Sequence, residues 1–244
     1  MRTNKKSNGF VLWEGPSLID GNPIVVIVTG INTASRNIKT GDMLQSHILV
    51  RNTNPIEALL QEQDYSICGN CPLRRKICYV DLRGTGQVWA KYKRGGYPQL
   101  NDNILQIIKY QQEYLRLGTY GDPAATPLKV WEPLINHVSG YTGYTHQWAN
   151  CEPGWKSLLM SSVESIPLKQ QANSMGWRTY RILSKGEAPL EDEILCKNYL
   201  DTHIHCEQCL LCNGGKGKNI AVPVHGWGSK VNNFHLMQTS MKGG

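Results

Sequence analysis

The residues most able to do chemistry in this chain are its eight cysteines, six of which form two short motifs. The motif nearer the C-terminus is Cys206-x-x-Cys209-x-x-Cys212, with Cys196 before it and His225 after it. Thiolates two residues apart on a short turn can converge on one ion, and tetrahedral zinc needs four such donors. The three cysteines, completed by either Cys196 or His225, therefore predict a zinc site.

The other motif is Cys68-x-x-Cys71 followed by Cys78, and it supplies three thiols. A fourth ligand would have to come from Cys151, His47 or an exchangeable group. The alternative for this motif is that one or two of its cysteines are buried free thiols. In the Cys206–Cys212 run, the close spacing makes unstrained disulfides unfavourable. There an iron–sulfur cluster is the alternative to zinc, because three close cysteines and a remote one also ligate [4Fe-4S]. The sequence thus predicts two metal sites.

Polar side chains also stand directly after predicted strands, where a barrel enzyme carries its chemistry. They are Asp122 in a Gly- and Pro-rich turn, Glu164, and the pair Tyr144 and His146. Two carboxylates on neighbouring strand ends can divide the work of glycosyl transfer, one attacking or stabilising a cation and the other moving protons. The alternative for Asp122 is a cap on the next helix, and for Glu164 an ordinary helix start.

Basic side chains beside these strands could contact phosphate. Arg116, Arg178 and Arg181 lie on or next to predicted strands, although arginines there are often only ion-pair partners. The segment 30–45 is dense in hydrogen-bond donors and includes Lys39, but its glycine spacing is not that of a P-loop. It is interpreted either as a phosphate- or base-binding loop or as a solvated loop.

Apolar patterning predicts the elements that position these residues. The predicted strands cover 23–28, 47–51, 115–118, 139–144, 158–163, 177–183 and 219–224. The predicted helices cover 55–63 with Asn54 as a cap, 86–94, 103–114, 127–137 and 167–175. Strand then helix, repeated, indicates an α/β fold with a mainly parallel sheet. The number of units favours a TIM-like (β/α) barrel, complete or lacking units, as one domain over 1–244, with metal-binding loops at 66–79 and 196–225.

The composition favours a polyanionic partner. The 244 residues carry a formal charge of +7 and a pI near 9.0, and Trp89 and Tyr92 are interleaved with basic residues. Such a surface suits nucleic acid, although many basic proteins have no specific partner. The N-terminus has no signal-like apolar region, and the strongest apolar run, 24–28, is too short to span a membrane. Clustered thiols then indicate a reducing, intracellular compartment.

Several of these segments together resemble a bacteriophage protein family with twin cysteine motifs. The matching segments are 37–45, Cys68-Gly-Asn-Cys71-Pro, Cys78-Tyr-Val, 115–123, Thr142-Gly-Tyr-Thr, Gly176-Trp-Arg-Thr and the cysteine run ending at His225. They are spread over most of the chain. This resemblance implies a protein of the cytoplasm of an infected bacterial host.

More distantly, the layout is similar to the queuine tRNA-ribosyltransferases and the phage DNA-guanine transglycosylases. That resemblance implies a barrel enzyme that exchanges a base of nucleic acid, most often DNA, for a 7-deazaguanine-type base. It implies Asp122 as the nucleophile, with Asp42 or Glu164 as a second acid, and a structural zinc. The zinc ligands that it implies are Cys206, Cys209, Cys212 and His225.

Two other functions remain open at this stage. The first is an iron–sulfur barrel enzyme of the radical S-adenosylmethionine kind, which analysis of the bound metal would separate from a zinc enzyme. The second is a non-catalytic, zinc-dependent DNA-binding or host-takeover protein. Replacing Asp122 by alanine would separate this binding protein from an enzyme, since only an enzyme would lose base release.

Overall fold

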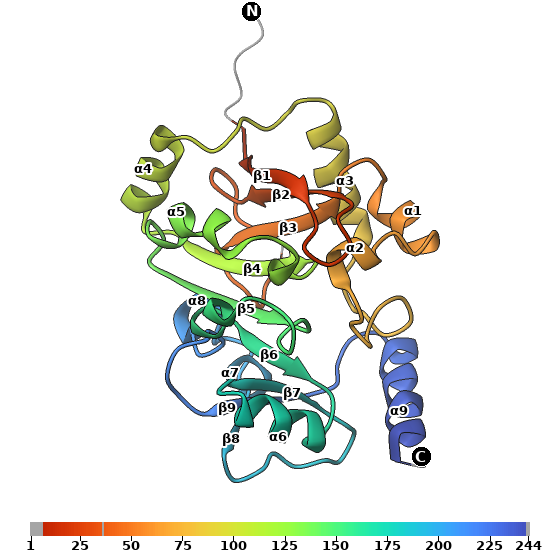
Figure 1. Ribbon diagram of the computed structural model, residues 1–244. Helices are drawn as coiled ribbons and strands as arrows, with labels where there is room; N and C mark the ends of the chain where they lie inside the picture. The colour runs from red at the N-terminus through yellow and green to blue at the C-terminus, as the bar shows by residue number, and fades with distance from the viewer. Residues whose placement is uncertain (1–6, 36, 243–244) are drawn as a thin grey trace, which may run out of the picture.

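A computed structural model, which describes residues 7–35 and 37–242, shows a mixed α/β fold built on one nine-stranded sheet (Figure 1). The strands are β1 Gly9–Pro16, β2 Pro23–Thr29, β3 Leu44–Val50, β4 Tyr114–Tyr120, β5 Gly140–Thr145, β6 Met160–Val163, β7 Thr179–Leu183, β8 Glu193–Leu195 and β9 Asn219–Pro223. Their order in the sheet is β1-β2-β3-β4-β5-β6-β7-β9-β8. The pairs β1–β2 and β2–β3 are antiparallel, and every later pair is parallel.

The connections between the parallel strands carry the helices. The α-helices are α1 Pro55–Leu60, α2 Tyr65–Cys68, α3 Leu82–Lys93, α4 Asp102–Gln111, α5 Glu132–Ile135, α6 Ile166–Ser174, α7 Lys197–Leu200, α8 Cys206–Cys209 and α9 Gly228–Lys242. Three short 3-10 helices are η1 Pro123–Ala125, η2 Leu128–Val130 and η3 Pro153–Ser157. Four of the α-helices, α1, α3, α4 and α6, begin at a capping side chain. These caps are Asn54, Asp81, Asn101 and Ser165, and each accepts an N–H of the first turn.

The apolar patterns predicted most of these elements. All seven predicted strands and four of the five predicted helices are present with shifted ends, and Asn54 caps α1 as expected. The predicted helix 127–137 is instead divided into η2 and α5, because Pro127 and Pro133 lack the N–H that a continuous helix needs. The strands β1 and β8 were not predicted.

A TIM-like barrel, complete or lacking units, was predicted; within the described residues the fold is α/β and the sheet is open. Closure would require the two outer strands, β1 and β8, to hydrogen-bond to each other, and each pairs with one neighbour only. The free side of β1 is occupied instead, since Val11 donates to the Pro98 carbonyl at 2.8 Å and accepts from Leu100 at 2.9 Å. The order from β3 to β7 nevertheless advances without the reversal of a doubly wound sheet.

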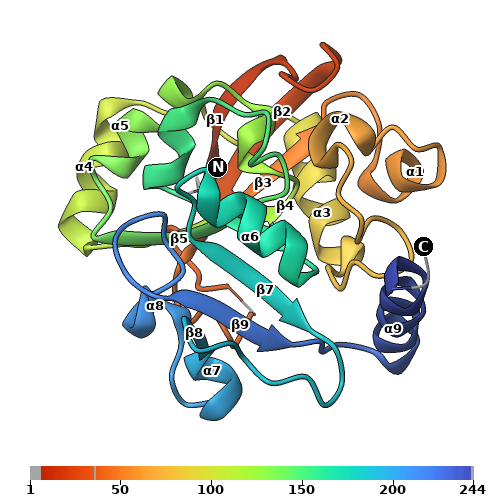
Figure 2. The ribbon, with the colours of Figure 1, turned by 60° about the horizontal axis from the view of Figure 1, so that its bottom comes forward.

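The buried apolar side chains form two clusters. The larger packs α4, α5 and α6 against β2 to β6 through side chains such as Ile108, Trp131 and Ala172. The smaller holds Met160 and Ile220 together with Cys196 and Cys212. We call the side of the sheet at this smaller cluster the tyrosine face, because it also carries Tyr144 and Tyr180. Figure 2 shows α6 lying over the sheet, with β7 and β9 side by side and running toward α9.

The edge at which the parallel strands end, called the carboxyl edge below, is covered by two segments distant in sequence. One is the loop 66–79, and the other is α9 (Figures 1 and 2). They touch, because Lys230 and Asn233 of α9 donate to the Arg75 and Lys76 carbonyls at 2.8 and 3.0 Å. This edge therefore brings the first cysteine motif to the ends of the central strands.

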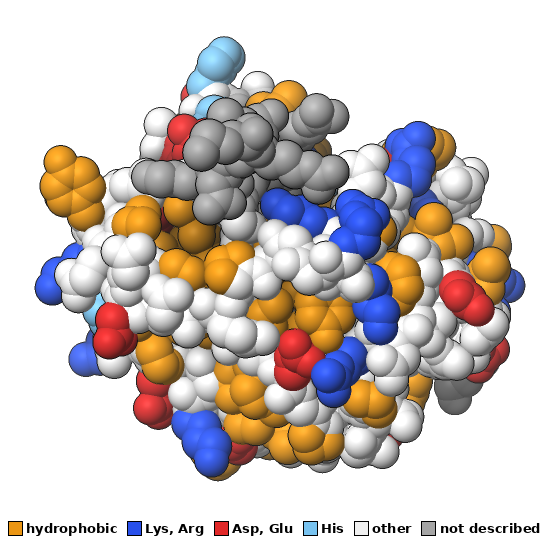
Figure 3. All heavy atoms as spheres, turned by 90° about the horizontal axis from the view of Figure 1, so that it is seen from above, with side chains coloured by type: hydrophobic (Ala, Val, Ile, Leu, Met, Phe, Trp, Pro, Cys, Tyr) orange, Lys and Arg blue, Asp and Glu red, His pale blue; other side chains and the backbone are white. Residues whose placement is uncertain are grey.

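Among the described helices, none is long and apolar enough to cross a bilayer. On the face that lies uppermost in Figure 1, Lys and Arg side chains are interspersed with acidic and apolar ones (Figure 3). The basic residues beside Trp89 and Tyr97 do pair with those rings, with Lys93 and Lys91 at 5.8 and 4.5 Å from the centroids.

Candidate functional site

Three polar side chains meet at the carboxyl edge, where β4, β5 and β6 end. Asp122, His146 and Glu164 each follow the last residue of a strand within two positions. The Asp122 carboxylate accepts the backbone N–H of His146 at 2.8 Å, and the His146 Nε2 lies 2.7 Å from Glu164 Oε1. Because the three strands are parallel neighbours, their ends place these groups side by side. Three residues that the sequence places after separate predicted strands therefore lie together.

The first cysteine motif is held against this histidine. The backbone N–H of Asp122 donates to the Ile67 carbonyl at 2.6 Å, and the Gln147 side chain donates to the Cys68 carbonyl at 3.0 Å. These bonds attach α2 to the ends of β4 and β5. Cys71 then lies beside the His146 imidazole and is one of the groups that raise the pKa of that imidazole.

The other two thiols of the motif belong to the same group. Cys68 interacts electrostatically with Cys71 and Cys78, and Cys78 interacts with Cys71 and His146. Burial raises the pKa of both the Cys68 and the Cys78 thiols, so an ion would have to provide the charge that favours their thiolates. The fourth member of the group is therefore His146, whereas Cys151 and His47 were the candidates named from the sequence.

The donor set fits a thiophilic metal. Three thiols and one imidazole form a common tetrahedral zinc set. A ligating histidine usually gives its second ring nitrogen to a carboxylate, and the buried Glu164 holds His146 in this way. In residues 7–35 and 37–242, no three Cys, His, Asp or Glu side chains already stand as ligands of one ion. Metal binding would therefore require the thiols to turn toward Nδ1 of His146.

The His146 imidazole also has a raised pKa. Burial lowers its pKa, but the neighbouring Cys71 thiolate and the Glu164 carboxylate outweigh this effect and raise the pKa well above the ordinary value. The imidazole thus lies between the Glu164 carboxylate and the Cys71 thiol.

Asp122, the predicted nucleophile, acts as a cap. Its Oδ1 accepts the N–H of Ala124 at 3.0 Å and begins η1, while its Oδ2 accepts the N–H of His146. Burial raises its pKa, and the charge of His146 and these hydrogen bonds oppose that rise. Both oxygens are engaged, so the capping alternative for Asp122 is confirmed.

Replacing Asp122 by alanine is expected to lower the free energy of unfolding by about 1 to 3 kcal/mol, because two buried N–H groups lose their acceptor. Asp122→Asn, which keeps one carbonyl oxygen, is expected to lose about half as much. Urea unfolding followed by circular dichroism measures both variants. An alanine variant of unchanged stability would contradict the capping role.

The second cysteine group lies on the tyrosine face. Cys196 and Cys212 pack beside Met160 and Ile220, and the Cys212 carbonyl accepts the N–H of Gly143 at 2.9 Å. The single turn α8 carries the two remaining thiols, Cys206 and Cys209. The thiol of Cys206 interacts with Cys196 and Cys209, and that of Cys212 interacts with Cys196 and Cys206. The structure therefore gathers four cysteines here.

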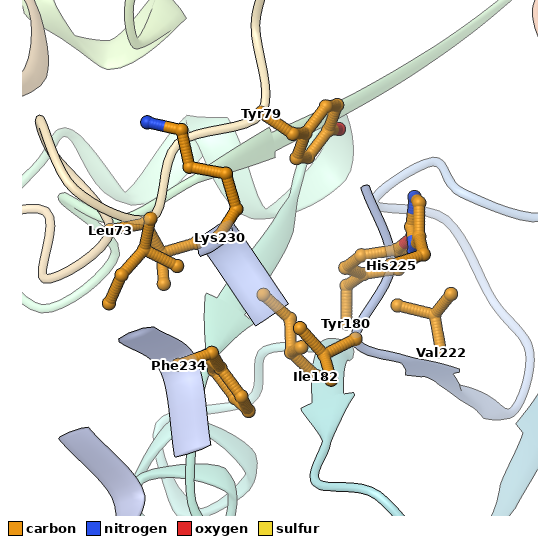
Figure 4. A pocket seen from close by; sticks show the side chains of 10 residues that line it. Leu73, Tyr79, Tyr180, Ile182, Val222, His225, Lys230 and Phe234 are labelled. Carbon is orange, nitrogen blue, oxygen red and sulfur yellow. The ribbon is translucent and has the colours of Figure 1, made fainter. Parts of the chain in front are cut away.

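His225 lies elsewhere, beyond the carboxyl end of β9. Its ring lies beside Tyr79, with centroids 5.5 Å apart and the ring planes tilted by 39°, and its Nδ1 lies 3.0 Å from the Pro223 carbonyl. It borders a shallow apolar pocket between the loop 66–79, β7, β9 and α9 (Figure 4). Of the two predicted fourth ligands of the C-terminal site, Cys196 is the one placed beside the other thiols.

The remaining predicted residues have separate positions. Lys39, Arg116 and Tyr144 face the second cysteine group. Arg178 is bound by carbonyls, donating to Asn213, Leu211 and Lys218 at 2.7, 3.1 and 2.6 Å, so it braces a loop. Asp42 precedes β3 at the opposite edge from Glu164, where its N–H donates to Glu207 at 2.6 Å. Asp42 therefore does not join the other two predicted catalytic carboxylates. Arg36, within the segment 30–45, lies outside the described residues.

Comparison of the chain with protein-family models, with curated protein sequences and with solved structures found no match. The arrangement of its own residues is therefore the basis for assigning a function.

Proposed function

We propose that this protein is a metal-dependent enzyme that modifies a base of nucleic acid at the carboxyl edge of its sheet. The observation that carries the proposal is that Cys71 and Cys78 lie near His146, whose Nε2 is held by buried Glu164. We further propose that the sheet derives from a (β/α) barrel with units missing, and that the enzyme acts in the cytoplasm of a phage-infected bacterium.

The location supports an active rather than a purely structural centre. In barrel-related sheets the carboxyl ends of the strands carry catalysis, whereas the opposite ends carry stability. The His146 centre lies at the carboxyl ends of β4 to β6. Zinc bound there would act as a Lewis acid, while a [4Fe-4S] cluster would supply electrons.

Neighbouring aromatic and basic side chains support a nucleic-acid substrate. Tyr79 of the cysteine loop contacts the His225 ring, and the apolar pocket that they border would receive a flat heteroaromatic ring (Figure 4). The net charge of +7 would attract a phosphate backbone. DNA is the proposed polymer, as the resemblance to transglycosylases implies.

Base exchange with a 7-deazaguanine-type base would use a different carboxylate at this site from the one that the sequence indicated. It needs a carboxylate with an oxygen to spare, and both oxygens of Asp122 are engaged. Glu164 uses only Oε1, toward His146, among the hydrogen bonds of the described residues. We therefore propose Glu164, and not Asp122 or Asp42, as the acid–base group.

A second candidate function rests on the same contacts. Cys71, His146 and Glu164 form a chain of thiol, imidazole and carboxylate, which is the order of nucleophile, base and orienting group in cysteine enzymes. Two further thiols in the same group favour metal binding, because a nucleophile needs only one.

The test is an assay of base modification by the full chain. Protein is purified aerobically and anaerobically, and each preparation is analysed for zinc and iron. Each is then incubated with bacteriophage DNA, and the nucleosides of the digested DNA are identified by mass spectrometry. We expect a changed or released base that disappears when the metal is chelated. Activity that survives chelation, and that Cys71→Ser alone abolishes among the three thiols, would favour the cysteine nucleophile. Metal-loaded protein that changes no base of DNA or RNA would refute both.

A further inference from the structure

The two segments that cover the carboxyl edge contain no acidic residue. Residues 65–80 and 224–242 hold five Lys and Arg but no Asp or Glu, although the whole chain has 19 acidic residues. Two of the five cations pair with acids of neighbouring segments. Among the described residues, Lys76 and Lys230 have no carboxylate within 4.0 Å. This edge is therefore suited to a polyanion.

Two aromatic rings at the same edge are exposed to solvent. Trp227 is 75% exposed and Tyr79 is 54% exposed. They lie in adjoining segments, because a Cβ placed on Gly226 would be 3.5 Å from that of Tyr79. Trp227 also lies between His225 and Lys230 in the chain, and both of these residues line the apolar pocket (Figure 4). The two exposed rings therefore flank this pocket.

The backbone that carries Trp227 is held in place. Its carbonyl accepts the N–H groups of Lys230 and Val231 at 2.8 and 3.1 Å, in the first turn of α9. Phe234 of the same helix is fully buried, and Asn233 donates to the Lys76 carbonyl. An exposed indole on an anchored helix loses little conformational freedom when another flat ring stacks on it.

The aromatic and basic cluster on α3, which the sequence indicated, is different. The Trp89 indole N–H donates to the Arg51 carbonyl at 3.3 Å, and the Tyr92 hydroxyl accepts from the Arg51 guanidinium at 3.2 Å. Arg51 also pairs with Glu14 at 2.8 Å. These polar groups are thus occupied within the chain and lie beside an acid, whereas the rings at the carboxyl edge face solvent.

We propose that the carboxyl edge binds a single strand of nucleic acid. One base occupies the apolar pocket, the neighbouring bases stack on Tyr79 and Trp227, and the phosphates lie beside Lys76. This inference rests on the proposed function and adds that the substrate is unpaired. Bases within a duplex have both faces covered by their neighbours, so they reach neither the rings nor the pocket.

Fluorescence anisotropy of the full chain with a labelled oligothymidylate of about 12 nucleotides tests this surface. Trp227→Ala and Tyr79→Ala are each expected to weaken binding about 10-fold, whereas Tyr79→Phe, which keeps the ring, binds as the wild type does. Tyr110→Ala is the matched control and keeps full affinity, because Tyr110 is 90% exposed on α4, next to the start of β4. Lys76→Gln is expected to reduce the slope of log Kd against log salt by about 0.7.

A duplex of the same length is expected to bind about 10-fold more weakly than the single strand. An oligouridylate shows whether the strand is DNA or RNA, and tight binding of either supports the surface. The inference is overturned if the wild type binds no single strand, if the duplex binds equally tightly, or if Trp227→Ala and Tyr79→Ala both keep full affinity.

Binding needs no turnover, so the two proposals fail separately. A chain that binds a single strand through Trp227 but changes no base refutes only the enzyme. Base modification by a chain whose affinity is the same in Trp227→Ala and Tyr79→Ala refutes only this surface. Circular dichroism verifies that each variant is folded, and Trp227, as the more exposed ring, is the decisive position.

Discussion

His146→Ala is expected to remove one metal equivalent and to reduce base modification by more than about 100-fold. The substitution takes away the only imidazole that contacts the Cys71 thiol and is fixed by Glu164. Three thiols would remain without the nitrogen donor that completes a tetrahedral set. Elemental analysis of the purified variant measures the first effect, and nucleoside analysis measures the second.

Two variants make this result specific. His225→Ala is the matched control, because His225 is also a histidine after a strand but contacts Tyr79 instead of thiols. It is expected to retain all the metal. Glu164→Gln should keep the ligand set and weaken metal binding about 10- to 100-fold, since it loses only the charge behind His146. Loss of metal in His225→Ala with full metal in His146→Ala would exclude the site proposed here.

Arg181→Met is expected to lower the free energy of unfolding by about 3 to 5 kcal/mol, the largest effect on stability predicted for one side chain of this protein. Arg181 is 1% exposed and donates to both oxygens of fully buried Glu193 at 2.8 and 2.7 Å. Its remaining nitrogen pairs with Glu187. Removing the guanidinium leaves a buried carboxylate without its cation, held by the Leu190 N–H.

The double variant Arg181→Met/Glu193→Met should recover most of this loss, because an apolar pair of similar volume fills the same space. Arg83→Met is the surface control: its pair with Asp81 is 75% and 59% exposed and should contribute less than about 1 kcal/mol. Urea unfolding measures all three. Equal stabilities of Arg181→Met and Arg83→Met would show that the buried pair contributes no more to the free energy of unfolding than the exposed pair does. Sequence alone had placed Arg181 among the residues that could contact phosphate.

Local patterns in the sequence predicted much of the fold. The continuous apolar run of β2 and the caps of α1 and η1 depend on residues close together in the chain. β1 was missed because Gly9, Gly15 and Pro16 are poor strand formers and a bulge between Val11 and Trp13 breaks its alternation. β8 was missed because three residues give too little pattern.

The site was predicted in parts. The cysteines and the strand-end residues were identified, but nothing in the order of residues shows that His146 meets Cys71. That contact depends on the register of β4 and β5 and on the bond from Asp122 to Ile67, which are long-range features. The available signal was an imidazole directly after a predicted strand. Asp42 was grouped with Glu164 because both border strands, but one lies where strands begin and the other where they end.

The position of β9 constrains how the polypeptide can acquire its native structure. This strand is the last to be synthesised, yet it lies between β7 and β8. During synthesis, β8 therefore has no strand to pair with until residue 223 has emerged from the ribosome. The edge of β7 that pairs with β9 is unpaired during that time. Cys196, Cys206, Cys209 and Cys212 are all translated in this interval. The outer third of the sheet, β7, β9 and β8, can therefore form only after nearly the whole chain has been synthesised.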